Sequence, residues 1–318
     1  MRDIAIDRRS LLALLGATAM TGCATAAPAT TPFFKRTGLP IGLQLYTLGP
    51  DAQKDLDGTL KAVAAIGYRD IELAGLYGRT PQQMRASLDA AGLKCSSAHI
   101  QAKGGGADPN FGDIAQLSDA LRVLGAKTAI LPSPNIPDRF AARGASEDAG
   151  TYLRRVLGSM TADDWKANAD FLNDKAAKLK SAGIKVGYHN HNVEFAPLGG
   201  TNGIEVMLKN TDPATVTFEM DVGWVAAAGH DPLEMLSHHK GRFTMMHVKD
   251  IKASTKPNFN LMQDPTEIGS GMLDWKKLLP AAYAEGVTRF FVEQEPPFER
   301  PRIDAVKIDH DYLAGLVA

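Results

Sequence analysis

The sequence has few of the features that would place it at once in a narrow functional class. It contains 2 cysteines in 318 residues, too few for the disulfide framework of a small secreted domain. Its formal net charge of -1 gives no basic footprint for nucleic acid. No Gly-x-Gly-x-x-Gly motif follows the first predicted strand, so a dinucleotide-binding fold lacks its fingerprint. We therefore expect neither a nucleic-acid-binding protein nor a dinucleotide-binding fold.

The apolar run near the N-terminus, residues 11–20, is too short to span a bilayer. It follows Arg8 and Arg9 and precedes small residues, which predicts an export signal over residues 1–27, most typical of the twin-arginine route. Met20-Thr-Gly-Cys23 resembles a lipobox. We expect a periplasmic protein that touches the membrane only through a lipid anchor at Cys23, if it has one.

The Pro/Thr-rich residues 28–38 are predicted to be a tether. From residue 39 to 318 the pattern predicts one domain in which strands and helices alternate. Cys95 lies in an apolar strand-like run and is interpreted as a buried small hydrophobe. The predicted strands cover residues 40–47, 69–74, 93–100, 127–131, 184–195, 216–221, 243–250 and 290–295, with a helical pattern after each.

Eight such strand–helix units favour a (β/α)8 TIM barrel of the α/β class, with an open doubly wound sheet as the alternative. Residues 132–150 form a long connection that is typical of a lid or binding loop. Four late strands each finish in carboxylates or imidazoles, at residues 189–194, 221, 247–250 and 293–295. Since barrel active sites form at the carboxyl ends of strands, this placement predicts a metal-assisted enzyme site.

Four motifs give the chain a clear resemblance to a known family. They are Tyr188-His-Asn-His-Asn-Val-Glu-Phe195, Asp221-Val-Gly-Trp224, His247-Val-Lys-Asp250 and Val292-Glu-Gln-Glu295. In this order they resemble the xylose isomerase-like TIM barrels, also called the sugar phosphate isomerase/epimerase family. The likeness covers nearly the whole chain after the export signal. It implies a barrel enzyme that acts on a small-molecule sugar with a divalent cation.

The resemblance implies a metal set of Glu, Asp, His and Glu at the ends of strands five to eight. Asp221, His247 and Glu293 match the last three ligands, while His189 stands where Glu is usual. Glu194 could supply the first carboxylate instead, by folding back from its loop. The resemblance implies manganese, cobalt or magnesium, and mixed imidazole and carboxylate ligands suit Mn, Co or Zn better than Ca. Relatives often form dimers or tetramers, so a homo-oligomer is also implied.

The implied chemistry begins with removal of a proton next to a carbonyl, and a cation offsets the charge that develops on oxygen. His191 and Glu194 are candidates for the base, and Glu295 is a weaker one. Lys249 could hydrogen-bond a substrate oxygen. Glu72, His99 and Trp224 are candidates for lining the sugar pocket. No phosphate-binding loop is present, so the expected substrate is an unphosphorylated sugar or keto-sugar.

Three alternatives remain at this point. The enzyme could isomerise or epimerise the sugar, or it could cleave a 3-keto-glycoside by β-elimination. The missing glutamate at the first ligand position motivates a third reading, a non-catalytic sugar-binding lipoprotein. An apurinic endonuclease of the same superfamily is disfavoured by the near-neutral charge and by the export signal.

Overall fold

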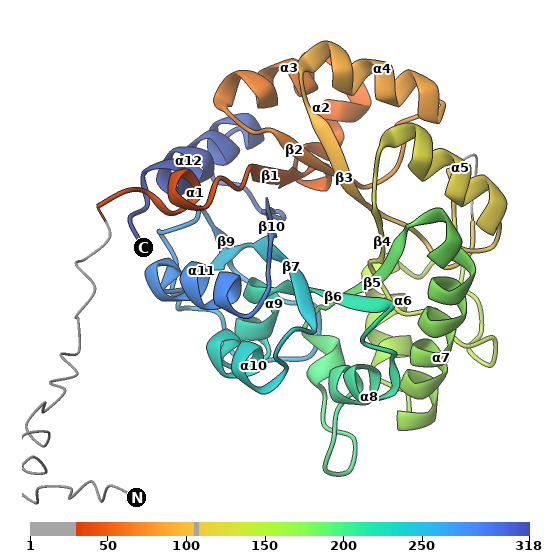
Figure 1. Ribbon diagram of the computed structural model, residues 1–318. Helices are drawn as coiled ribbons and strands as arrows, with labels where there is room; N and C mark the ends of the chain where they lie inside the picture. Colours follow the sequence, from red (N-terminus) through yellow and green to blue (C-terminus); the bar gives the residue numbers. More distant parts are fainter. Residues whose placement is uncertain (1–29, 105–107) are drawn as a thin grey trace, which may run out of the picture. The chain divides into compact units, whose positions relative to one another are not determined.

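The computed structural model describes residues 30–104 and 108–318, and parallel strands form a closed barrel at its centre (Figure 1). Around the barrel the strands follow the order β1-β10-β7-β6-β5-β4-β3-β2. This confirms the predicted (β/α)8 barrel and excludes the open sheet. The barrel strands are β1 (Ile41–Gln44), β2 (Asp70–Leu73), β3 (Lys94–His99), β4 (Thr128–Leu131), β5 (Lys185–His189), β6 (Val216–Asp221), β7 (Phe243–Val248) and β10 (Arg289–Val292).

The strands are buried on both faces, since side chains fill the barrel inside and helices cover it outside. Every residue of β1, β2, β4 and β6 is buried. This explains the largely apolar sequences of β1 and β4, although polar and apolar residues alternate in β2 and β6. It also means that any charged side chain within them, such as Glu72 or Glu219, must find its partners inside the protein.

A ring of helices surrounds the barrel (Figure 1). Two helices begin with a capping box: Thr80 and Gln83 form one at the start of α4, and Thr161 and Asp164 form one at the start of α7. The helices are α1 (Phe33–Thr37), α2 (Gly49–Lys54), α3 (Leu56–Ile66), α4 (Pro81–Ala91), α5 (Ile114–Leu124), α6 (Ala149–Leu157), α7 (Ala162–Leu179), α8 (Gly203–Asn210), α9 (Val222–Ala227), α10 (Pro232–His238), α11 (Trp275–Ala284) and α12 (Arg302–Gly315). Short 3-10 turns cover Leu45–Leu48, Lys180–Ala182 and Val193–Phe195.

Part of the predicted tether, residues 28–38, is wrong. Residues Phe33–Thr37 form helix α1, and Phe33 and Phe34 are buried in the hydrophobic core. The Phe33 amide donates to the Leu316 carbonyl at 2.8 Å, which places α1 beside the C-terminal end of the chain (Figure 1). Burial of the two adjacent phenylalanines removes apolar surface from water. This stabilisation outweighs the preference of the surrounding prolines and threonines for an extended chain.

The long loop after β7 contains a small antiparallel pair, β8 (Asp250–Ile251) with β9 (Pro265–Thr266). The buried Asp250 carboxylate organises it by accepting hydrogen bonds from the Gly269 amide and the Trp275 indole at 2.9 and 2.8 Å. A Cβ at Gly271 would lie 2.1 Å from Asp250 Oδ1, so this close approach requires glycine. The loop is therefore fixed in place, and it carries Leu261 to the mouth of the barrel.

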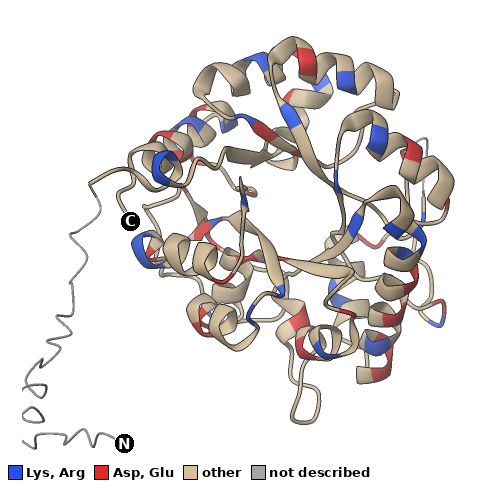
Figure 2. Ribbon diagram, viewed as in Figure 1, with Lys and Arg blue, Asp and Glu red and all other residues tan. Residues whose placement is uncertain are grey.

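The predicted export signal and the lipobox at Cys23 lie outside the described residues and stay predictions. Within residues 30–104 and 108–318, no helix has the length and apolar character needed to cross a bilayer. Cys95 is free and buried, as predicted. Segments with Lys or Arg and segments with Asp or Glu are interspersed around the ring of helices (Figure 2).

Candidate functional site

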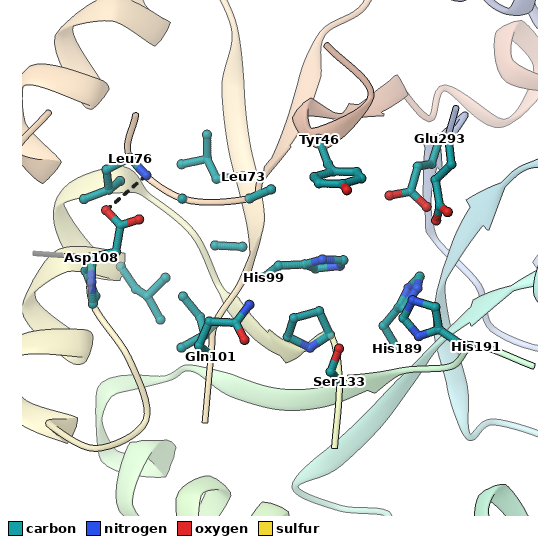
Figure 3. Close-up of a pocket in the computed structure, with 18 of the residues that line it drawn as sticks. Tyr46, Leu73, Leu76, His99, Gln101, Asp108, Ser133, His189, His191 and Glu293 are labelled. Atoms are coloured by element: carbon teal, nitrogen blue, oxygen red, sulfur yellow. Dashed lines mark hydrogen bonds between the residues drawn. The ribbon is translucent and has the colours of Figure 1, made fainter. Parts of the chain in front are cut away.

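The ends of β1 to β7 and β10 surround a cavity of about 660 Å³. Its two ends differ (Figure 3): His189, His191 and Glu293 lie at one end, and Leu76 and Asp108 at the other. The first end is formed by the late strands and carries imidazoles and carboxylates. The second is formed by the connections that follow β2, β3 and β4, and most of its side chains are apolar.

Four predicted ligands come together at the polar end. Single ligand atoms of His189, Asp221, His247 and Glu293 all lie within 4.8 Å of one another. His247 Nδ1 is 3.1 Å from Glu293 Oε2 and 3.7 Å from Asp221 Oδ2. His189 Nε2 is 3.9 Å from the same Asp221 oxygen. Two imidazoles and two carboxylates at such spacings form a suitable ligand set for a divalent transition metal.

Lys249 lies beside this cluster and is fully buried. Its Nζ is 2.8 Å from Asp221 Oδ2, 2.6 Å from Glu293 Oε2 and 2.7 Å from Glu295 Oε1. The ammonium compensates the charge of carboxylates that would otherwise be buried without a counterion. Burial disfavours the charged form, but the three carboxylates outweigh it and raise the pKa of Lys249 well above its usual value.

A second polar layer lies below the first, inside the barrel. Glu219 Oε2 is 3.1 Å from His99 Nε2, 3.2 Å from His189 Nδ1 and 3.1 Å from His247 Nε2. Glu72 Oε2 is 2.7 Å from His247 Nε2 and accepts a hydrogen bond from the side-chain amide of Gln44 at 3.0 Å. Ser97 donates to the other Glu72 oxygen at 2.6 Å. Both carboxylates are completely buried.

His189 and His247 therefore stand between the two layers, with one ring nitrogen on each side. Their lower nitrogens face Glu219, and their upper nitrogens face Asp221 and Glu293. A carboxylate on the far nitrogen of a ligating histidine fixes the tautomer and the ring orientation. Glu219 can do this for both histidines at once.

The charges of the cluster follow from these contacts. Burial and the neighbouring imidazoles hold the pKa of His189 well below its usual value, so its ring is neutral, the form that binds metals. Burial also opposes charge on His99, but Glu72 and Glu219 outweigh it and raise the pKa of His99 to about 9. The pKa of Glu293 is held well below its usual value because Lys249 and His247 outweigh the effect of burial.

The Asn residues of the His-Asn-His-Asn motif tie the site to its neighbours. Asp221 donates its amide to Asn190 Oδ1 at 3.1 Å, which joins the ends of β5 and β6. Leu261 donates its amide to Asn192 Oδ1 at 3.1 Å, which joins the same segment to the long loop after β7. Because the two histidines alternate with these asparagines, both imidazoles are left free to line the cavity.

Most of the remaining predicted residues also reach the cavity. His99, His191, Trp224 and Glu295 line it together with His189 and Glu293. The His191 ring lies 5.5 Å from the Trp224 ring. Asp221 and His247 lie directly behind this surface and are fully buried. The roles predicted for the residues of this site, as metal ligands or as substrate contacts, stay predictions. The structure does bring these residues together in one place.

Three predicted placements are corrected by the structure. Glu194 is fully buried; it accepts from the Tyr188 hydroxyl at 2.6 Å and from the His191 amide at 2.9 Å. It neither lines the cavity nor belongs to a ligand cluster among the described residues, because its turn directs it back to β5. Glu72 and Lys249 also do not line the cavity, since other side chains of the site cover both.

Sequence reasoning gave no role to Glu219 or Tyr46. Glu219 lies two residues before Asp221 on β6, and this spacing puts both side chains on one face of a strand. That signal was present in the sequence. Tyr46 lies in a 3-10 turn after β1 and lines the cavity opposite His189 (Figure 3). No local pattern in the sequence marks it.

Comparisons with known proteins agree with this geometry. The sequence profile described as the xylose isomerase-like TIM barrel matches residues 60–315. A sugar phosphate isomerase/epimerase from Parabacteroides distasonis is 26% identical, with 95% of this chain and 98% of that chain covered and a TM-score of 0.68. An inosose dehydratase from Geobacillus thermodenitrificans is 24% identical over 297 residues, 86% of this chain and 96% of the relative. A Mycobacterium smegmatis barrel in complex with magnesium shares the fold at 16% identity and a TM-score of 0.60, with coverage of 87% and 96%.

Proposed function

The chain belongs to the xylose isomerase-like TIM barrel family, and we propose that it is a sugar-processing enzyme that uses a divalent metal ion. It removes a proton next to a carbonyl of an unphosphorylated sugar or keto-sugar. One observation carries the proposal: His189, Asp221, His247 and Glu293 meet at the carboxyl end of the barrel, beside a cavity large enough for a sugar.

The donor set fits a divalent cation. Its atoms are close enough to share one ion, and Glu219 holds the two imidazoles from behind as metal ligands are usually held. His189, Asp221, His247 and Glu293 would hold the cation. When bound, it supplies positive charge that offsets the charge developing on a substrate oxygen as the neighbouring carbon loses its proton.

The rest of the chemistry belongs to the residues of the chain. His191 is the best candidate for the base, because it lines the cavity and, unlike Glu194, its ring is not fixed by a buried partner. Glu295 also lines the cavity and could return the proton, although its Oε1 is paired with Lys249 at 2.7 Å. Trp224 offers an apolar ring beside His191 for the C–H face of a sugar.

An unphosphorylated substrate is supported by the lining of the cavity. Among the described residues that surround it there is no arginine or lysine, the side chains that most often bind phosphate. The family name used for the Parabacteroides relative therefore does not carry over literally to this chain.

β-Elimination is the second candidate reaction, favoured by the similarity to inosose dehydratase over 86% of the chain. In a 3-keto-glycoside the base takes the proton from C2, and the electron pair forms a C1–C2 double bond. The C1–O bond breaks, and the departing alkoxide takes up a proton. Isomerisation and epimerisation also begin with removal of a proton next to a carbonyl. All three reactions therefore require a base near that carbon and positive charge near the carbonyl oxygen.

The test compares two isosteric substitutions. Asp221→Asn removes a ligand charge but leaves an oxygen to accept from the Trp224 amide, which Asp221 Oδ1 now does at 2.9 Å. Asp113→Asn, at the start of α5, is the matched control because Asn caps helices as well as Asp does. Each protein is loaded with Mn2+ and dialysed; its metal content is measured, and its turnover of 3-keto-glucosides and free ketoses is assayed.

We expect the wild type and the control to retain metal and turnover, and Asp221→Asn to lose both by at least about 100-fold. Turnover that persists in chelator would disprove the metal-dependent mechanism. A protein that is stabilised by sugars but converts none of them would instead be the sugar-binding alternative.

A further inference from the structure

The end of the cavity far from the metal ligands has no role in the proton transfer proposed above. We define the apolar wall as the side chains of Leu73, Leu76, Ile100, Pro109, Leu121 and Leu153, all of which line this end. They come from the end of β2, from the connections after β2 and β3, from α5 and from α6. The four ligand candidates lie on β5, β6 and β7 and directly after β10, so the ligand set and the wall can be varied separately.

The wall is held in a fixed shape. Leu76 donates its amide to Asp108 Oδ1 at 3.3 Å, a contact drawn in Figure 3. Tyr77 next to it has a φ of 52°, a left-handed backbone conformation that non-glycine residues seldom adopt. Its hydroxyl reaches the Leu45 carbonyl at 3.4 Å. Strain of this kind persists where neighbouring contacts require it, often at ligand-binding sites.

The size of the cavity exceeds what one sugar ring needs. Its volume of about 660 Å³ lies in the middle of the range of about 300–1,000 Å³ for pockets that hold drug-sized ligands. A sugar placed against His191 and Trp224 therefore leaves the wall uncovered. Water at an apolar wall gains no hydrogen bonds from it, so a substrate group that displaces this water is stabilised.

The chemistry of the wall decides what that group is. Aliphatic side chains cannot form hydrogen bonds with hydroxyls, so a second sugar buried there would leave polar groups without partners, which destabilises the complex. Polar side chains on this half, Gln101, Ser133 and Asp108, are wholly or partly exposed to solvent. The wall thus suits an apolar group whose outer edge meets water.

We infer that the apolar wall binds an apolar substituent, of the size of a phenyl ring, carried by the sugar substrate. The substrate class is then a keto-glycoside of an apolar alcohol or phenol, rather than a free monosaccharide. This inference rests on the proposed function and deepens it, because it assigns the second half of the same cavity. It also selects β-elimination among the reactions considered, since that reaction releases the substituent.

The experiment compares two substrates that differ only in this group, a methyl and a phenyl 3-keto-β-glucoside, with Mn2+-loaded enzyme. We expect kcat/KM for the phenyl compound to exceed that for the methyl compound by at least about tenfold, mostly through KM. The physical reason is that the phenyl ring buries more apolar surface against the wall than the methyl group does. Because phenol also leaves more readily than methanol, a cyclohexyl glucoside is included, and its preference over methyl should match that of phenyl within about threefold.

A substitution in the wall sharpens the test. Leu153→Ser replaces a partly buried side chain of the wall on α6, and it should bring the cyclohexyl-to-methyl ratio close to one. Leu233→Ser is the control, because Leu233 is also a partly buried leucine packed on the core but does not line the cavity. It should leave the ratio unchanged.

The outcomes separate this inference from the function on which it rests. Equal, metal-dependent turnover of all three glucosides would overturn the apolar subsite and keep the proposed function. A cyclohexyl glucoside that binds at least about tenfold more tightly than the methyl compound in calorimetry, with no turnover, would support the subsite and overturn the function. A ratio that Leu153→Ser leaves unchanged would overturn the assignment of the wall.

Discussion

The two ends of the cavity are built in different ways. At the polar end, side chains from strands β2, β3, β5, β6 and β7 hold one another in two buried layers, with Glu219 in contact with three histidines. At the other end, the apolar wall comes largely from connections and from helices α5 and α6. Strands fix the positions that the proposed proton transfer requires, while connections can change to fit another substrate without moving those positions.

The difference should be visible first in stability. Leu121→Ala, in the wall, should lower the free energy of unfolding by about 2–5 kcal/mol at every pH, because it leaves a cavity. His99→Gln, in the polar end, should have an effect that depends on pH. The pKa of His99 is raised from 6.5 to about 9 in the folded protein. Its charged form therefore stabilises the fold fully below about pH 6.5, and this stabilisation is lost as the pH rises through 9.

The measurement is chemical denaturation of the two variants and the wild type in chelator between pH 6 and 9.5. The difference in the free energy of unfolding between the wild type and His99→Gln should become smaller as the pH rises over this range. The same difference for Leu121→Ala should stay constant. Parallel curves for both variants would show that the two ends do not differ in electrostatics.

A second prediction concerns the lower layer of the polar end. Glu219→Gln should weaken Mn2+ binding by about 10–100-fold, because His189 and His247 lose the carboxylate that orients them. Glu205→Gln is the matched control, since Glu205 pairs with His239 at 2.9 Å outside the cavity. The affinity is measured by calorimetric titration with Mn2+. If both variants bind like the wild type, Glu219 has no role in orienting the ligands.

The smallest effect is expected at Glu194, which lies in the same motif as the site histidines but outside the cavity. Glu194→Gln should lower kcat less than tenfold, because the glutamine oxygen can still accept from the His191 amide while its NH2 group donates to the Tyr188 hydroxyl. His191→Asn should lower it by about 100-fold or more, the range expected for loss of a general base. The steady-state kcat values of the two variants decide whether His191 or Glu194 is the base. A larger loss of kcat in Glu194→Gln than in His191→Asn would identify Glu194 as the base.

Much of the polar end could be predicted from the sequence, since strand ends in a barrel meet whatever their separation along the chain. Asp221, His247 and Glu293 were found in this way. Glu194 was misplaced because the sequence does not show where a turn directs its side chain; the 3-10 turn of Val193–Phe195 directs it toward Tyr188. The apolar wall could not be predicted, because its leucines read in sequence like any other core residues.

The sequence by itself determined the alternation of strands and helices, the helix caps and the set of chemical groups at the strand ends. These depend on local periodicity and on residues close to one another in the chain. Only the tertiary structure decided that Glu219 supports two histidines, that Lys249 is buried among three carboxylates and that one cavity has a polar and an apolar end. Such relations depend on the closure and register of the barrel, which bring together side chains far apart in the chain, such as Glu72 and His247 at 175 residues.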